Sequence, residues 1–140
     1  MAKKKVTKAK APAKKVVKKV TKEKKGVRLV SSVILGAIFG VVCWFGITHV
    51  SGYPMSTAEI LATILNRALI GFCIGISNWR NMNYLLHGLI MGLLVTIPLS
   101  IFPLVDGRIL MGFASLEVAG AVYGLLTELI VTKLLKAPIA

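Results

Sequence analysis

Arg67 and Glu117 are ionisable residues that lie well inside long apolar stretches of this 140-residue sequence. An arginine near the middle of a bilayer costs about 2.5–3.5 kcal/mol on insertion scales, so an anionic partner is expected. The other carboxylates of the apolar part are predicted nearer the helix ends; they are Glu59, Asp106 and Glu128. We therefore predict a buried, hydrogen-bonded ion pair between Arg67 and Glu117.

Such a pair could have a structural role or a role in transport. A buried ion pair can fix the register of two packed helices. Alternatively, an intramembrane charge marks a pathway for an ion, a proton or an anionic group. A third interpretation moves the helix boundary, so that Arg67 lies near the outer interface. The sequence leaves all three open.

Few other residues offer chemistry. Cys43 and Cys73 have no further cysteine or histidine at metal-binding spacing, so we expect no metal site, no cofactor and no disulfide framework. His87 is interpreted as an interface histidine, and Glu128 and Lys133 as a solvated helix end. Motifs of hydrolases, zinc proteases, P-loop enzymes and dinucleotide-binding enzymes are absent from the sequence. We therefore expect a protein that is not an enzyme.

Four apolar runs must position these residues. The chain is 56% apolar, with a mean hydropathy of +0.78. About 20 helical residues span the hydrocarbon core, and four runs reach that length: about 29–50, 59–79, 84–105 and 109–132. The polar faces of soluble core helices are missing, so we predict an all-α membrane protein with four transmembrane helices in a compact bundle. Ser56 and Glu59 form a capping box at the start of the second helix, and Pro98 should kink the third.

The basic residues divide the chain into two parts. Residues 1–28 hold 12 Lys and one Arg against one Glu, whereas residues 29–140 hold five basic and four acidic residues. We predict a disordered lysine-rich arm over 1–26 and a transmembrane domain over 27–140. By the positive-inside rule the arm is cytoplasmic, and four spans return the C-terminus to the same side of the plasma or inner membrane.

Anionic surfaces are the expected partners of the arm. In composition, "KAPAKK" and its surroundings resemble the lysine tails of histone-like proteins, and that resemblance covers only the arm. Each Lys beside anionic lipid at the inner leaflet contributes about 1 kcal/mol, so we expect membrane lipid as the partner. Nucleic acid is an alternative, because counterion release needs only positive charge. No aromatic residue interrupts the lysines, so single strands would find nothing to stack on.

Each apolar run also contains one G-x-x-x-G pair. Small residues at this spacing let helix backbones approach closely in lipid, so we predict helix-packing sites at Gly36, Gly40, Gly71, Gly75, Gly88, Gly92, Gly120 and Gly124. The first pair maps onto the third with an offset of 52 residues, and the second onto the fourth with an offset of 49. This spacing predicts two parallel repeats of a two-helix hairpin. Convergent glycine placement stays open as an alternative.

These observations predict a small, non-enzymatic, polytopic membrane protein. We expect it to form a homo-oligomer or to pack with a membrane partner through its glycine-rich helix faces, and to anchor the basic arm at the inner leaflet. The alternative is a small transporter or channel subunit with its pathway at the Arg67–Glu117 pair.

Overall fold

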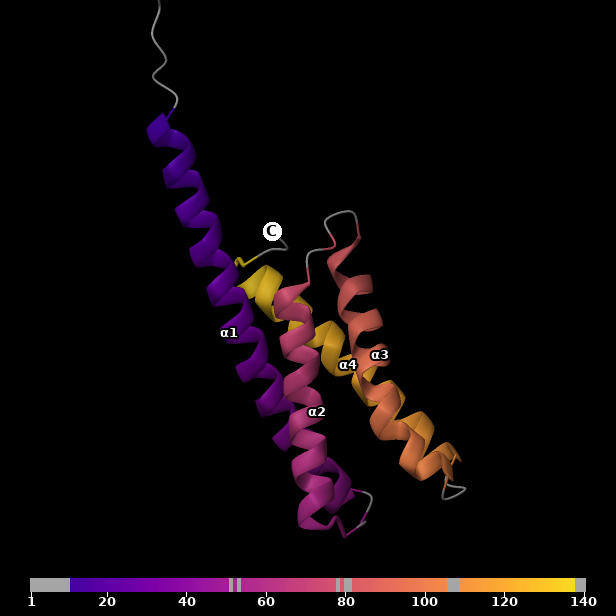
Figure 1. Ribbon diagram of the computed structural model, residues 1–140. Coiled ribbons are helices and arrows are strands. Elements are labelled where there is room, and N and C mark those ends of the chain that lie inside the picture. Colours follow the sequence, from indigo (N-terminus) through magenta and orange to yellow (C-terminus); the bar gives the residue numbers. More distant parts are fainter. Residues whose placement is uncertain are drawn as a thin grey trace, which may run out of the picture.

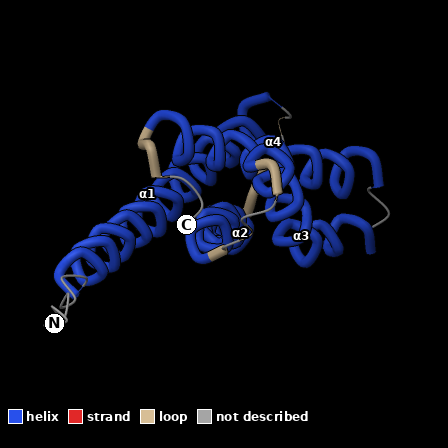
Figure 2. The backbone as a smooth tube through the Cα atoms, turned by 90° about the horizontal axis from the view of Figure 1, so that it is seen from above, coloured by secondary structure: helices blue, strands red, loops and turns tan. Residues whose placement is uncertain are grey.

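The described part of the chain is all-helical, as predicted. The computed structural model describes residues 11–50, 52, 54–77, 79, 82–105 and 109–137, without the side chains of 11–25, 104 and 109–111. The helices are α1 (Ala11–Val50), α2 (Thr57–Ile76), α3 (Tyr84–Val105), the π-helix η1 (Ile109–Ala114), α4 (Ser115–Leu129) and the π-helix η2 (Ile130–Leu134). Figure 1 shows their arrangement, and Figure 2 views α2 nearly end-on, beside the other helices.

Four helical segments are long and apolar enough to cross a membrane: Gly26–Val50, Thr57–Ile76, Tyr84–Pro103 and Gly112–Leu134. They agree closely with the four predicted runs. α2 begins and ends slightly earlier than predicted, which makes Arg67 its eleventh residue of 20. Arg67 is therefore central in α2, and the interpretation that placed it near the outer interface is not supported.

The start of α2 is fixed by the predicted capping box. The Ser56 hydroxyl accepts a hydrogen bond from the Glu59 backbone N–H at 3.3 Å, and the Glu59 carboxylate accepts one from the Ser56 N–H at 2.7 Å. These two bonds satisfy backbone donors that have no partner inside the helix.

α1 is longer than the sequence predicts. It begins at Ala11, so residues 11–26 continue the helix where we predicted a disordered arm, while residues 1–10 lie outside the described part. Lys and Ala are strong helix formers, and extending an existing helix requires no new nucleus. Figure 1 shows this N-terminal part of α1 projecting beyond the other helices.

The helices pack as two neighbouring pairs, α1 with α2 and α3 with α4. In the first pair, Gly36 lies against the backbone of Arg67 and Ala68, and Gly71 against the backbone of Ser32. In the second pair glycine meets glycine, because Gly88 faces Gly124 and Gly92 faces Gly120. A Cβ atom at any of these glycines would overlap the neighbouring helix, so the absent side chains permit this close approach.

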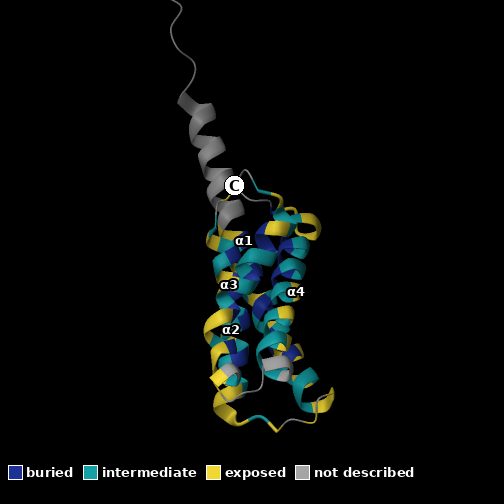
Figure 3. Ribbon diagram, turned by 90° about the vertical axis from the view of Figure 1, so that its right-hand side faces the viewer, coloured by how far each residue is buried: buried dark blue, intermediate teal, exposed yellow. Residues whose placement is uncertain are grey.

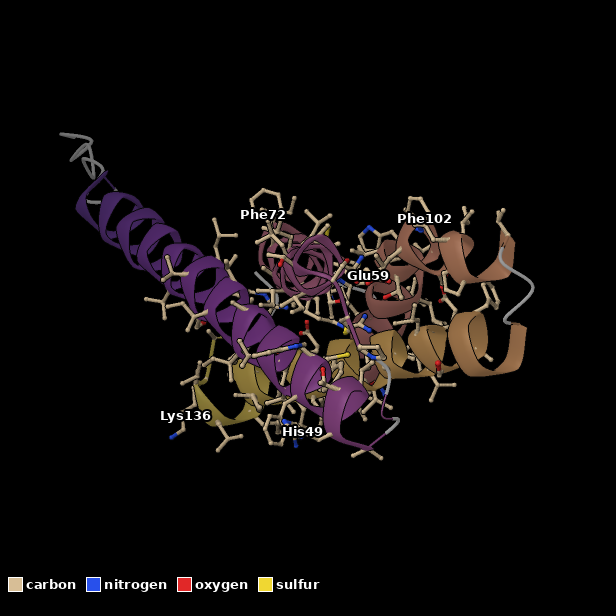
Figure 4. All side chains as sticks on the ribbon, turned by 90° about the horizontal axis from the view of Figure 1, so that it is seen from below. His49, Glu59, Phe72, Phe102 and Lys136 are labelled. Carbon is tan, nitrogen blue, oxygen red and sulfur yellow. The ribbon has the colours of Figure 1, made fainter. Side chains whose placement is uncertain are left out.

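The surface and the interior have opposite character. Among the described residues the buried apolar ones are Cys43, Ile70, Ile74, Val131 and Ala137, and the buried polar ones are Arg28, Ser32, Thr63, Arg67, His87, Thr96, Ser100, Thr127 and Glu128. Figure 3 shows buried positions on the faces that the helices turn toward one another. Large apolar side chains such as Phe72 and Phe102 point outward (Figure 4). Among the described side chains, the buried ones are therefore mostly polar.

Candidate functional site

One buried charged group lies where α1 meets the C-terminal end of α4; we call Arg28, Glu128 and His87 the Arg28 cluster. Their side chains are at most 2% exposed. Arg28 Nη2 donates to both Glu128 carboxylate oxygens, at 2.7 and 2.8 Å. The arginine therefore has a carboxylate partner at full contact, which offsets its burial.

Glu128 has two further partners. One ring nitrogen of His87, Nδ1, lies 3.1 Å from a Glu128 oxygen, and the other, Nε2, lies 2.8 Å from the Ser77 hydroxyl. The Thr132 hydroxyl donates to the other Glu128 oxygen at 2.8 Å. The cluster thus joins α1, the end of α2, the start of α3 and the end of α4.

The C-terminal turn completes this cluster. Lys136 adopts a left-handed backbone conformation, with φ of 50°, just after η2. The turn is held by a hydrogen bond from the Ala137 N–H to the Val131 carbonyl at 3.1 Å. It presents the Ala137 carbonyl to Arg28 Nη1, which donates to it at 2.7 Å.

Two sequence-based interpretations are corrected here. Glu128 was assigned to a solvated helix end and His87 to an interface, yet both are fully buried. The sequence contained a signal for Glu128, which follows Gly124 by four residues and so lies on the glycine face of α4. His87 had no such signal, because it points about 100° away from the neighbouring Gly88. Lys133 is exposed as expected, and its ammonium group lies 5.7 Å from the centre of the Tyr84 ring.

The second buried charge is Arg67, in the middle of α2 and 1% exposed. Its Nη1 donates to the Thr96 hydroxyl at 2.9 Å and to the Asn66 side-chain oxygen at 3.2 Å. Its Nη2 contacts the Leu116 carbonyl at 3.5 Å and the Cys43 sulfur at 3.8 Å. Its Nε has no hydrogen-bond partner.

The fifth neighbour of Arg67 is an aromatic ring. The guanidinium carbon lies 5.4 Å from the centre of the Tyr123 ring, within the range of a cation–π contact. The ring itself stacks on Phe39 of α1, with a centroid distance of 5.2 Å. We call Arg67 with Cys43, Asn66, Thr96, Leu116 and Tyr123 the Arg67 site.

The predicted ion pair between Arg67 and Glu117 is not formed in the described structure. The Glu117 carboxylate instead accepts a hydrogen bond from the Ser100 hydroxyl. The carbonyl of Leu116, one residue earlier, is the group of α4 that reaches Arg67. Arg67 and this part of α4 therefore lie side by side. The pairing fails because successive helical residues point about 100° apart, so that Glu117 contacts α3.

α3 supplies the hydroxyl at the Arg67 site. The Thr96 hydroxyl donates to the Gly92 carbonyl at 2.7 Å, which orients its oxygen as an acceptor for Arg67. Gly120 of α4 lies against this hydroxyl, where a Cβ atom would overlap it. α3 continues through Pro98 to Val105, and the kink at Pro98 stays a prediction.

Cys43 and Cys73 are free thiols, the first buried and the second half-buried. Within the described residues, no group of three His, Cys, Asp or Glu side chains lies close enough to hold a metal ion. The site is thus defined by two arginines, one with a carboxylate partner and one with neutral partners.

Comparison of the chain with protein-family models, with curated proteins and with solved structures finds no match of any of the three kinds.

Proposed function

We propose that the chain is a small, non-enzymatic, multi-pass membrane protein that holds a basic helix at the cytoplasmic face of the plasma or inner membrane. The observation that carries this proposal is the buried ion pair between Arg28 and Glu128. Arg28 directly follows the lysine-rich part of α1, and Glu128 lies near the end of α4. The pair thus joins α1 to α4 at the point where the lysine-rich part of α1 ends.

The membrane setting is supported by the distribution of side chains. Four helices have the length and composition of spans. The buried groups of the described residues are mostly polar, whereas large apolar side chains face outward. A water-soluble protein rarely exposes so large an apolar surface, but lipid covers it without loss.

The proposed orientation is supported by the Arg28 cluster and the lysines. The cluster joins the start of the first apolar helical segment to the end of the fourth, which supports placing both at one side of the membrane. The lysine-rich segment and Lys136 lie on that side, which makes it cytoplasmic by the positive-inside rule. The outer side then carries Ser56 and Glu59.

Thiol labelling tests this orientation. In a Cys43→Ser, Cys73→Ser background, single cysteines at Ser56 and Lys136 are exposed to a membrane-impermeant maleimide. Ser56→Cys should react in intact cells, and Lys136→Cys only after permeabilisation. The reverse pattern would overturn the proposed topology.

The proposed partner of the basic helix is anionic lipid at the inner leaflet. A lysine-rich segment gains about 1 kcal/mol per Lys near such a surface. Trypsin should therefore cut the segment more slowly in vesicles that contain phosphatidylglycerol than in vesicles of phosphatidylcholine alone. If trypsin cut the segment equally fast in both kinds of vesicle, and only duplex DNA protected it, the partner would be nucleic acid and not lipid.

Association with a second copy or with a membrane partner stays part of the proposal, but through a different surface. The eight glycines predicted for it lie against residues of the same chain. Association would then use outward-facing side chains such as Phe72 and Phe102. Disulfide cross-linking of single Phe72→Cys or Phe102→Cys variants tests it, and a monomer in lipid nanodiscs would refute it.

We also retain the two-hairpin repeat within a compact bundle as a proposal. Its support is that each pair of neighbouring helices contains two glycine pairs. The two hairpins differ in register. Gly36 faces Arg67, eight residues before Gly75. Gly40 faces Ile64, seven residues before Gly71, whereas the α3 glycines face the α4 glycines directly. A common ancestor therefore requires one helix to have shifted by about two turns.

The transporter alternative relied on an Arg67–Glu117 pathway, and these two residues have other partners. The observation that still supports this alternative is that Arg67 is buried without a carboxylate partner.

A further inference from the structure

We propose that Arg67 binds a small monovalent inorganic anion of the halide class within the membrane-spanning part of the protein. This inference goes beyond the function proposed above and does not depend on it. It starts from the Arg67 site, where a permanent positive charge is buried among neutral groups.

The charge of Arg67 cannot be removed by deprotonation. A guanidinium group keeps its proton under all conditions in which proteins are folded. At 1% exposure its charge is shielded from solvent, and a buried charge is stable only with a compensating partner. A counterion at or near Arg67 would therefore lower the free-energy cost of burying this charge.

The described residues around Arg67 do not supply one. α1 contributes the Cys43 thiol, α3 the Thr96 hydroxyl, and α4 the Leu116 carbonyl and the Tyr123 ring. α2 itself contributes the Asn66 amide. Every one of these groups is neutral in its ordinary protonation state.

The described carboxylates are engaged elsewhere. Glu117 accepts from Ser100, and Glu128 is bound by Arg28. Glu59 lies two turns before Arg67 on the same helix, about 12 Å away along its axis, in a capping box. The counterion is thus expected to come from solution.

The open donor indicates the size of the anion. Arg67 Nε is buried and has no hydrogen-bond partner, while both terminal nitrogens already have acceptors. A halide can use one N–H donor and a nearby positive charge, whereas sulfate or phosphate needs several donors at once. Chloride is therefore the probe of choice.

Chloride-dependent stability tests the inference. A ligand that binds the folded protein alone raises its unfolding midpoint as concentration passes the dissociation constant. We would measure the thermal unfolding midpoint in detergent against chloride, with gluconate holding the ionic strength constant. The variants are Arg67→Met, which removes the site, and Arg28→Met, the matched control with the same change at the other buried arginine.

Wild type, Arg28→Met and Glu117→Gln should show a saturable rise of the midpoint with chloride, and Arg67→Met none. The surface lysines are common to all variants, so their weak chloride binding cancels in this comparison. A wild-type midpoint that does not depend on chloride, or a dependence that survives in Arg67→Met, would overturn the proposal.

A second measurement covers the case in which Arg67→Met does not fold. The ³⁵Cl NMR line of the wild-type protein should be broadened by exchange with the bound state and narrowed again by excess thiocyanate. Arg67→Lys, which keeps the charge without the planar guanidinium, should retain weaker broadening. Line widths equal to those of empty detergent micelles would refute the site.

Discussion

The two buried arginines have the same side chain and the same burial but opposite surroundings. Arg28 contacts both oxygens of a buried carboxylate, a backbone carbonyl and the Thr132 hydroxyl. Arg67 contacts a hydroxyl, an amide, a carbonyl, a thiol and an aromatic ring. In each, the Nε atom has no partner. The difference therefore lies in the counterion and not in the number of hydrogen bonds.

This contrast separates two uses of a buried charge. An arginine paired with a carboxylate is part of the structure, because removing either partner leaves the other charged, buried and alone. An arginine among neutral groups adds less to stability and is free to bind an anion. The two arginines also differ in position: Arg28 lies where the lysine-rich part of α1 ends and reaches the end of α4, whereas Arg67 lies halfway along α2.

Removing the carboxylate of the Arg28 cluster should have the largest effect. Glu128→Gln leaves Arg28 buried without a counterion, and breaking a buried pair costs about 3–5 kcal/mol of unfolding free energy. Unfolding in mixed detergent micelles measures it. The control is Glu117→Gln, whose carboxylate accepts from Ser100, and its loss should stay below about 1 kcal/mol. Equal losses would remove the distinction between the two carboxylates.

Filling a glycine at the Arg28 cluster should have the next largest effect. A Cβ atom at Gly88 would lie 2.7 Å from the Glu128 Cβ and 2.6 Å from the Gly124 carbonyl oxygen. Gly88→Ala must push α4 and Glu128 away, and such overpacking costs about 1–3 kcal/mol. Thermal unfolding compares it with Gly46→Ala, where a Cβ atom meets nothing within 4 Å. If both variants unfold at the wild-type midpoint, the two helices are not in contact there.

The smallest effect is expected at the hydroxyl beside Arg67. Thr96→Val removes an acceptor from Arg67 and a donor to the Gly92 carbonyl, and such bonds contribute about 1 kcal/mol in membranes. The matched control is Thr48→Val, whose hydroxyl donates only within its own helix, to the Trp44 carbonyl. Unfolding free energies of the two variants that differ by less than experimental error would mean that Thr96 does not hold Arg67.

Much of the fold follows from the sequence alone. The length of the apolar runs predicts the positions of the long helices, and the third predicted run, 84–105, coincides with α3. The S-x-x-E pattern places the start of α2. The extension of α1 to Ala11 was missed because repulsion among lysines was weighed above their helix propensity. The π-helices at both ends of α4 leave no recognisable sequence pattern.

The site was predicted less well. Arg67 is buried, as its predicted place in an ion pair required. Glu128 and His87 were assigned to a solvated helix end and to an interface, although both are fully buried. The partner of each charge could not be derived, because it depends on the rotation of each helix about its axis. The composition of a single helix does not determine that rotation.

Unfolding free energies of Arg28→Met and Arg67→Met, measured side by side in chloride-free buffer, test the central contrast most directly. Arg28→Met should lose about 3–5 kcal/mol, because Glu128 stays buried without its cation. Arg67→Met should change by less than about 1 kcal/mol or become more stable, because Thr96 and Asn66 keep other partners, the carbonyls of Gly92 and Val95. An equal loss in both variants would contradict the account, since Arg67 would then have a counterion within the protein.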